Sequence, residues 1–268
     1  MLYIAERDGV IVGFLHLARG PNESMEDLLT APGTIAALCV IECEGDDEIA
    51  GNLLHHASEE CKSLGATHCT YRPLLPGTAF YLGFGARGSM IGATAPEQRT
   101  CQWLQQADYS PLVPTNAWEV DLDAFELPID RGLLQVRRNS TVNREVDEPM
   151  LPWLQACMLG HTEPVAFQLI DRREKRVVSE VLFWTVGSEL QTSPVSSVWL
   201  WPPLLAEIDS DEFTRQLFLV GESLREFQEE RIDTAIAVSA AHDTRQNEFF
   251  RRLGFSTSES GVVFEKRL

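Results

Sequence analysis

The stretch Gly33–Arg72 constrains the fold more than any other part of this chain, because it alternates strand, helix and strand patterns. Thr34–Cys43 is apolar and β-branched, as buried strands are, and a turn residue, Gly45, follows it. Apolar residues then recur at helical spacing until Gly65, which predicts a helix that ends at a glycine. Thr67–Tyr71 again has strand character. The stretch therefore predicts a β-α-β unit, whose helix start presents free backbone N–H groups to an anion.

The order of elements around this unit occurs twice along the 268 residues. In the first copy a hairpin (Leu2–Leu17) precedes the unit and a short helix (Thr94–Ala107) follows it. The second copy repeats hairpin, strand, amphipathic helix, strand and short helix, after a charged stretch without a helical pattern, Val136–Pro149. We therefore expect an internal duplication, with two domains of ordinary size at residues 1–125 and 126–268.

The first copy is expected to end in two separate strands. These are Tyr109–Val113 and Trp118–Leu122, and Pro111 and Pro114 lie in or just after the first of them. A proline gives no N–H group to a strand ladder. The sequence therefore places the first of these strands at a sheet edge.

The charge and composition exclude several classes of function. The formal net charge is −18, and residues up to Phe125 hold six Lys/Arg against seventeen Asp/Glu. A surface this acidic argues against binding nucleic acid and against binding anionic membranes. The N-terminus lacks the basic and apolar regions of a signal peptide, and no apolar run is long enough to span a bilayer. We expect a soluble, cytoplasmic protein.

The cysteines and histidines do not form a pattern that binds metal. The six cysteines contain no C-x-x-C pair, and small buried thiols in a reducing compartment are the expected state. His55 and His56 are adjacent, so their side chains diverge on a helix, and no carboxylate is spaced to join either one. The sequence predicts no metal site.

Two stretches of the chain resemble a known family. ERDGVIVGFLHL (Glu6–Leu17) resembles the second and third strands of the GNAT acetyltransferase superfamily, and QNEFFRRLGF (Gln246–Phe255) is similar to its late helix and the Gly-Phe after it. Glu97–Tyr109 repeats this late element more weakly. The chain thus looks like a tandem GNAT protein, as in mycothiol synthase-like enzymes. The resemblance implies an α+β fold of two GNAT-like domains, each with a mixed, mostly antiparallel twisted sheet flanked by helices.

The first GNAT-like domain starts directly at its hairpin. The first strand and the two opening helices of the family are either missing or supplied by residues that the pattern does not place. A truncated N-terminus is a third explanation for this start.

Resemblance to the family implies acetyl-CoA, held along a splayed fourth strand and by a loop of the form Q/R-x-x-G-x-G/A. Here the strand supplies Leu38 and Val40, and the matching hexamer is Gly45-Asp46-Asp47-Glu48-Ile49-Ala50, followed by Gly51. Ala50 fits the motif, whereas Glu48 replaces its first glycine and Gly45 its basic or amide residue. Each like-charge contact at ~4 Å costs about 1 kcal/mol even in water. The acids also have a simpler explanation, because Asp and Glu stabilise helix starts without any ligand.

The catalytic residues that the resemblance implies are also only partly present. The family's late-helix tyrosine, which protonates the departing thiolate, corresponds to Phe250 in the second copy and Leu104 in the first, and neither donates a proton. Tyr81 is an alternative proton donor, and it equally fits an aromatic anchor in a packed loop. Glu42 or Glu44 fits a general base just past the strand, and an acid at a strand end is also commonly a solvated one.

The leading hypothesis is an acetyl-CoA-dependent N-acyltransferase that acts on a small or peptidic amine, with the cofactor in the first half. An acidic surface would attract cationic acceptors, which suits this substrate class. The alternative is a catalytically inactive GNAT-like module that senses a ligand or binds a protein. The sequence makes no prediction of the oligomeric state.

Overall fold

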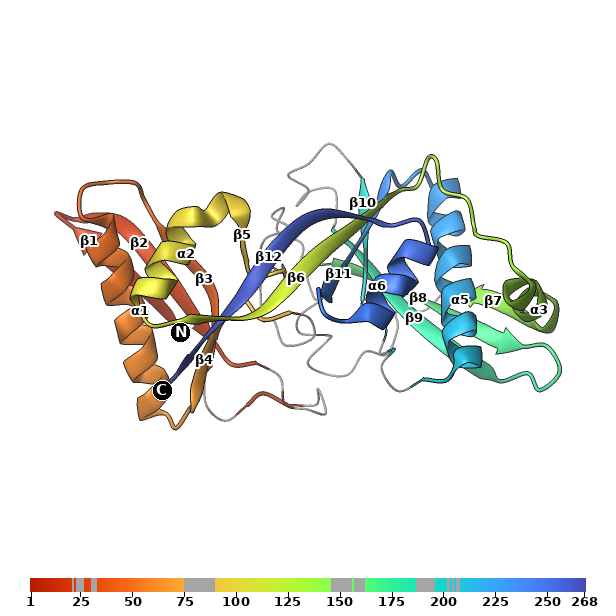
Figure 1. Cartoon of the computed structure of the whole chain (residues 1–268), viewed down its shortest axis with the longest axis horizontal. Helices are drawn as coiled ribbons and strands as arrows, with labels where there is room; N and C mark the ends of the chain where they lie inside the picture. Colours follow the sequence, from red (N-terminus) through yellow and green to blue (C-terminus); the bar gives the residue numbers. More distant parts are fainter. Residues whose placement is uncertain are drawn as a thin grey trace.

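The structure is a computed structural model of the chain, shown in Figure 1. It describes residues 1–20, 22, 27–29, 33–74, 90–145, 156, 162–186, 196–201, 203, 205 and 208–268. The elements of the first half are β1 (Leu2–Arg7), β2 (Val10–Ala18), β3 (Thr34–Val40), α1 (Asp46–Ser63), β4 (His68–Tyr71), β5 (Ala93–Thr94), the 3₁₀ turn η2 (Ala95–Glu97), α2 (Gln98–Gln106) and β6 (Ser110–Asp121). Those of the second half are α3 (Arg131–Asn139), β7 (Ser140–Arg144), β8 (Thr162–Asp171), β9 (Val177–Val186), β10 (Ser197–Leu200), α5 (Ser210–Glu229), β11 (Thr234–Ala240), α6 (Thr244–Arg252) and β12 (Ser256–Arg267).

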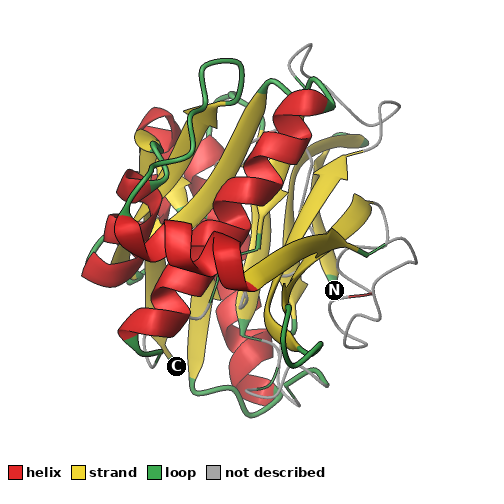
Figure 2. Cartoon of the chain, turned by 90° about the vertical axis from the view of Figure 1, so that its right-hand side faces the viewer, coloured by secondary structure: helices red, strands yellow, loops and turns green. Residues whose placement is uncertain are grey.

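All strands of the described part join one sheet that runs the length of the molecule (Figure 1). Its order is β1-β2-β3-β4-β12-β6-β11-β10-β9-β8-β7, with β5 paired to β12. The pairs β3–β4 and β10–β11 are parallel, and the remaining pairs are antiparallel. Figure 2 shows most of the helices gathered on one side of the strands. The expected α+β class, with a mixed and mostly antiparallel twisted sheet, is confirmed.

The two halves repeat one another element by element. In each, an antiparallel hairpin (β1–β2 or β8–β9) leads to a strand (β3 or β10), a long helix (α1 or α5) and a parallel strand (β4 or β11). A short helix (α2 or α6) and one long strand (β6 or β12) complete each half. The second half carries α3 and β7 in addition, and they have no counterpart among the described elements of the first half.

The last strand of each half lies in the sheet of the other half. β12 pairs with β4 from Phe264↔Tyr71 to Arg267↔His68, and β6 pairs with β11 from Thr234↔Asp121 to Ala240↔Thr115. The two long strands also pair with each other along most of their length. The halves are therefore joined by a mutual exchange of strands at the centre of the sheet.

The expected pair of strands at the end of the first half is wrong, because β6 is one continuous strand. Its prolines are tolerated for a local reason. β11 reaches only as far as Thr115, so Pro111 and Pro114 lie where β6 has a strand partner, β12, on one side only. The N–H group that a proline lacks is not needed on the side without a strand. The prolines thus lie in a part of β6 that is at a sheet edge, as expected, whereas the rest of β6 has a strand on both sides.

The expectation of a stretch without helix at Val136–Pro149 is wrong as far as Asn139, where α3 ends; the strand β7 follows it to Arg144. Asp130 caps α3, since its side chain accepts a hydrogen bond from the Leu133 backbone N–H at 2.9 Å. Only Leu133 of this helix is fully buried. So short a helix depends on its cap and on packing beside α5, which a local pattern does not reveal.

Each half has its own hydrophobic core beneath its helices. In the first half, apolar residues of α1 and α2 pack on β2, β3 and β4 with Phe264 of the exchanged strand. In the second half, α5 and α6 pack on β8–β11 with Trp118 and Val120 of β6. The exchanged strands therefore contribute to the packing of both cores.

None of the helices in the described ranges is long and apolar enough to cross a membrane.

Candidate functional site

The first half contains a gap in the sheet where two parallel strands separate. β3 and β4 pair only at Thr34↔Thr70 and Ile35↔Tyr71, whereas β3 continues along β2 to Val40. The β2–β3 register shifts at this point and leaves one extra residue, Ala36, in β3. A bulge of this kind bends its strand away from a neighbour. Beyond Ile35, the side of β3 that faces β4 is therefore not paired with it.

A tyrosine and an arginine lie at the start of this gap. The Tyr71 side chain is fully buried, and its hydroxyl has no hydrogen-bond partner in the described part of the chain. The Arg72 guanidinium lies 5.0 Å from the centre of the Tyr71 ring and pairs with Glu97 at 2.8 Å. Glu97 also accepts the Thr94 backbone N–H at 3.0 Å in a capping box. The gap thus begins at a buried phenol beside a partly buried, paired cation.

The start of α1 lies near this gap and carries many acidic side chains. Gly45 precedes the helix with φ of 79°, a left-handed conformation that favours glycine. Asp46 is buried and pairs with Arg99 of α2. Asp47 accepts a hydrogen bond from the Trp103 indole N–H at 2.6 Å. The acids are thus held by side chains of α2.

The charge at this helix start opposes binding of the pyrophosphate of acetyl-CoA. Five carboxylates lie on the helix start and the turn before it, namely Glu42, Glu44, Asp46, Asp47 and Glu48. Two arginines face them: Arg99, which lies 3.7 Å from Glu42, and Arg7, which donates to the Glu44 carbonyl at 2.7 Å. The local charge is therefore −3, from five negative and two positive groups. A phosphate dianion would meet repulsion here in place of the usual attraction of a helix start.

The residues that the sequence singled out fall into two groups. Leu38, Ile49 and Ala50 are buried between α1 and the sheet, with Val40 and Gly51 partly buried near them. The others surround the start of α1, where Glu44 and Glu48 are exposed and the Glu42 side chain is 92% exposed. Tyr81 lies outside the described residues. The structure thus brings Glu42, Gly45 and Glu48 together around one helix start.

Sequence reasoning missed the residues that hold this region together, which are Tyr71, Arg72, Arg99 and Trp103. Their signal was weak, because each depends on a contact that is distant in sequence. Trp103 reaches Asp47 across 56 residues, and Arg72 reaches Glu97 across 25. An arginine directly after a strand and before Pro73 was the one local indication of Arg72.

The equivalent positions of the second half serve its own folding. Asp209 caps α5 by accepting the Glu212 backbone N–H at 2.8 Å. Asn247 of α6 is buried, where it accepts from the Ser239 hydroxyl at 2.8 Å and donates to the Ala241 carbonyl at 2.9 Å. Phe250, at the position of the family's tyrosine, is fully buried. The first half therefore remains the better candidate for a site.

No group of three or more His, Cys, Asp or Glu side chains in the described residues is arranged to bind a metal ion. The cysteines of that part are free thiols. Cys61 and Cys69 lie buried with their Sγ atoms 3.8 Å apart, next to the buried Tyr109. Burial, which was expected of the cysteines, holds for Cys61 and Cys69, whereas Cys39 is exposed and Cys43 and Cys101 are partly exposed.

We predict that the buried phenols make the fold sensitive to alkali. Burial raises the pKa of Tyr71 and of Tyr109, so both stay protonated in the folded state when an exposed phenol ionises near pH 10. The unfolded state then binds fewer protons than the folded state. Stability should be unaffected below about pH 10 and fall above it by about 1.4 kcal/mol per pH unit for each phenol. Urea unfolding at a series of pH values measures this slope.

Tyr71→Phe separates the phenol from the other groups that titrate in this range. Above about pH 10, the free energy of unfolding of the variant should fall less steeply with pH than that of the unmodified chain. At neutral pH the two proteins should be similarly stable, because the Tyr71 hydroxyl has no hydrogen-bond partner to lose in the described part of the chain. Equal slopes for the two proteins would contradict the prediction.

Comparison with known proteins identifies the fold. No family model matches the chain, and no curated protein matches it. A tandem GNAT protein from the clavulanic acid biosynthesis pathway is 13% identical, with a TM-score of 0.58 over 99% of this chain and 82% of that one. A GCN5-related N-acetyltransferase from Sphaerobacter thermophilus is 12% identical, with a TM-score of 0.55 over 97% of this chain and 78% of that one.

A third structure is the GCN5-related glucosamine N-acetyltransferase region of a fungal multi-domain β-N-acetylglucosaminidase. It is 12% identical, with a TM-score of 0.64 over 96% of this chain, which spans 32% of the length of that protein. At these identities the likeness concerns the fold alone. The chain has the fold of a tandem GNAT acetyltransferase.

Proposed function

We propose that this protein is an acetyl-CoA-dependent N-acyltransferase that acts on a small or peptidic amine in the cytoplasm. The observation that carries the proposal is the separation of β3 from β4 beyond Ile35, on the fold of a tandem GNAT acetyltransferase. The unpaired side of β3 offers strand hydrogen bonds to an extended chain that contains amide groups. The pantetheine arm of an acyl donor has that form.

In this proposal the chain's own side chains move the protons. Glu42 or Glu44 takes a proton from the acceptor amine, and Tyr81 donates one to the leaving group. Tyr71 is a second candidate donor, because its hydroxyl is buried at the start of the gap. Leu38, Val40 and residues 45–51 are the proposed donor-binding segment. The acidic surface favours a cationic acceptor.

One observation favours a second candidate function. Asp46 and Asp47 at the start of α1 are held by Arg99 and Trp103, and the remaining negative charge there opposes a pyrophosphate. A catalytically inactive GNAT-like module for ligand sensing or protein interaction would need no such site.

Calorimetric titration with acetyl-CoA separates these two functions. If the first half holds the donor, binding should be measurable, and Glu48→Gln should tighten it several-fold. Removing one like charge at ~4 Å from a phosphate is worth about 1 kcal/mol in water. Glu48 is exposed, so the substitution leaves the packing of α1 intact. Glu59→Gln is the matched control, because Glu59 is an exposed acid on the same helix about three turns away.

The control should bind acetyl-CoA like the unmodified chain, and amine-dependent release of CoA should follow with the right acceptor. An absence of heat at millimolar acetyl-CoA for all three proteins would reject the enzyme and leave the inactive module. Equal tightening by Glu48→Gln and Glu59→Gln would place the donor away from the start of α1.

A further inference from the structure

The two halves contain equivalent helices and strands but differ in what covers them. In the second half, β7 pairs with the outer edge of β8 over five residues, from Ser140↔Asp171 to Arg144↔Phe167. α3, which precedes it, packs beside α5 and buries Leu133 in the core. One helix and one strand, α3–β7, therefore close this end of the sheet.

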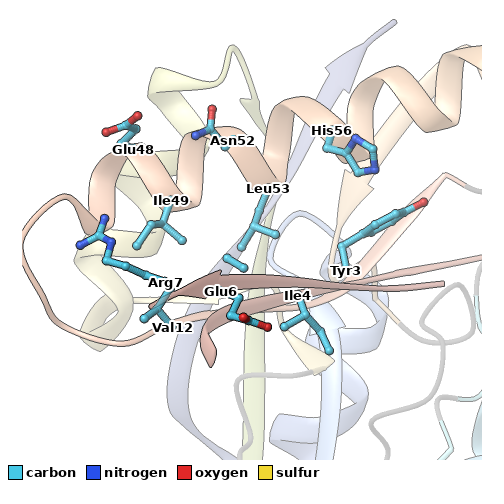
Figure 3. Close-up of a pocket in the computed structure, with 11 residues that line it drawn as sticks. Tyr3, Ile4, Glu6, Arg7, Val12, Glu48, Ile49, Asn52, Leu53 and His56 are labelled. Atoms are coloured by element: carbon cyan, nitrogen blue, oxygen red, sulfur yellow. The ribbon is translucent and has the colours of Figure 1, made fainter. Parts of the chain in front are cut away.

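The corresponding end of the first half is open. β1, the counterpart of β8, ends the sheet with no strand on its outer side among the described residues. Between β1 and α1, the counterpart of α5, lies a groove of about 440 Å³ (Figure 3). Ile49 and Leu53 of α1 point into it, and Tyr3 lies edge-on to His56 at one end, with ring centroids 4.6 Å apart. The lining also includes polar side chains, such as Arg7 and Asn52. An open edge strand beside a groove is a surface that other chains can pair with.

The exposed apolar side chains of the described part also concentrate at this end. Of twelve large exposed hydrophobic residues, five belong to the first eleven positions. They are Met1, Leu2, Ile4, Val10 and Ile11. Ile4 lines the groove with 53% of its surface exposed. Exposed apolar groups that gather in one place indicate an interaction surface.

Charge indicates what kind of chain fits there. In the second half, Arg144 of β7 pairs with Glu226 at 3.2 Å and with Glu230, both near the end of α5. Glu226 lies three residues before the last residue of α5, and Glu60 lies three residues before the last residue of α1. Burial raises the pKa of Tyr3, which lines the groove, and the nearby Glu60 carboxylate raises it further. A cation on an added strand would therefore meet an acid at the equivalent place.

We propose that the β1 edge and the groove beside it bind a partner polypeptide built like α3–β7. The partner contributes a short basic amphipathic helix, which packs against α1, and a following strand, which pairs antiparallel with β1. Main-chain hydrogen bonds to the edge provide affinity, and a cation near Glu60 sets the register. The groove shares Glu48 and Ile49 with the proposed donor-binding segment, but the peptide titration contains no acetyl-CoA, so its outcome does not depend on acyl transfer.

The test uses α3–β7 itself as the probe. A fluorescein-labelled peptide of residues 130–145, DRGLLQVRRNSTVNRE, is titrated with the full chain and followed by fluorescence anisotropy. We expect saturable binding below about 1 mM and slower hydrogen exchange of β1 amides in the complex. Ile4→Asp should weaken binding by about tenfold or more, because it places a charge on the apolar surface. Val177→Asp is the matched control, since Val177 is 45% exposed at the far end of the sheet, and should change nothing.

A charge exchange tests the register. Glu60→Arg in the full chain should weaken its binding of the peptide. A peptide that carries Arg144→Glu should bind this variant again. A lack of saturation at 1 mM, or binding that Ile4→Asp leaves unchanged, would overturn the proposal. Sedimentation of the chain alone provides the other control. A dimer that Ile4→Asp abolishes would assign the surface to a second copy and would also overturn it.

Discussion

Neither half of this protein should fold when it is expressed alone as residues 1–125 or 126–268. In the first fragment, β4 loses β12, and β6 loses both of its partners, β11 and β12. In the second fragment, β11 loses β6, and β12 loses β4 and β6. Each fragment would expose apolar residues that the exchange now buries in the core of the other half, including Trp118 of β6 and Phe264 of β12. A small domain has too little remaining stability to tolerate such a loss.

Mixing the two fragments should restore the structure, because every missing strand is present in the partner. Circular dichroism and size-exclusion chromatography measure the result. Each fragment alone should be unfolded or aggregated, and the mixture should give one folded complex with the mass of the full chain. Two separately folded, monomeric fragments would show that the exchanged strands are dispensable and that residues 1–125 and 126–268 are autonomous domains.

Replacing Gly92 by alanine should destabilise the fold by about 4 kcal/mol. Gly92 has φ of 78°, where an L-residue is strained by ~1–3 kcal/mol. An added Cβ would also lie 2.2 Å from the Val262 carbonyl oxygen and 2.4 Å from its carbon. Overlap with backbone requires β5 and β12 to move apart, and overpacking of this kind costs ~1–3 kcal/mol. Urea unfolding monitored by tryptophan fluorescence measures the loss.

Gly9→Ala separates the two contributions. Gly9 has φ of 79°, almost the same as Gly92, but nothing lies within 4 Å of a Cβ added there. It should therefore lose only the conformational part, about 1 kcal/mol. Equal losses for the two variants would mean that β5 and β12 are not in close contact at Gly92.

Much of the fold follows from patterns that are local in the sequence. The β-α-β unit appears as β3, α1 and β4, close to the expected bounds, because burial of one helix face and one strand run fixes it. The late helix, expected within Gln246–Phe255, is found as α6 at Thr244–Arg252. The exchange of β6 and β12 could not be predicted, because both halves offer the same strands and the pattern does not say which half pairs with which.

The candidate site likewise contains residues that local sequence predicts and residues that it does not. The acids at the start of α1 were recognised, since they adjoin the helix that they precede. Their partners on α2, and the buried phenol of Tyr71 beside the gap, depend on how distant segments pack. The pattern showed charges that oppose a phosphate, and the structure adds that two of them, Asp46 and Asp47, are held by Arg99 and Trp103.

The exchange of strands also has a consequence for the order in which this chain is made. β4 ends at Tyr71 and its partner β12 reaches Arg267, so 196 residues are synthesised between the two. At ~5–20 residues per second, the ribosome needs roughly 10–40 s to add them. During that time the first half has its hairpin, β3, β4 and α1 but lacks the strand that completes its sheet. The edge of β4 therefore stays open until β12 has been synthesised and the same chain supplies the strand that covers it.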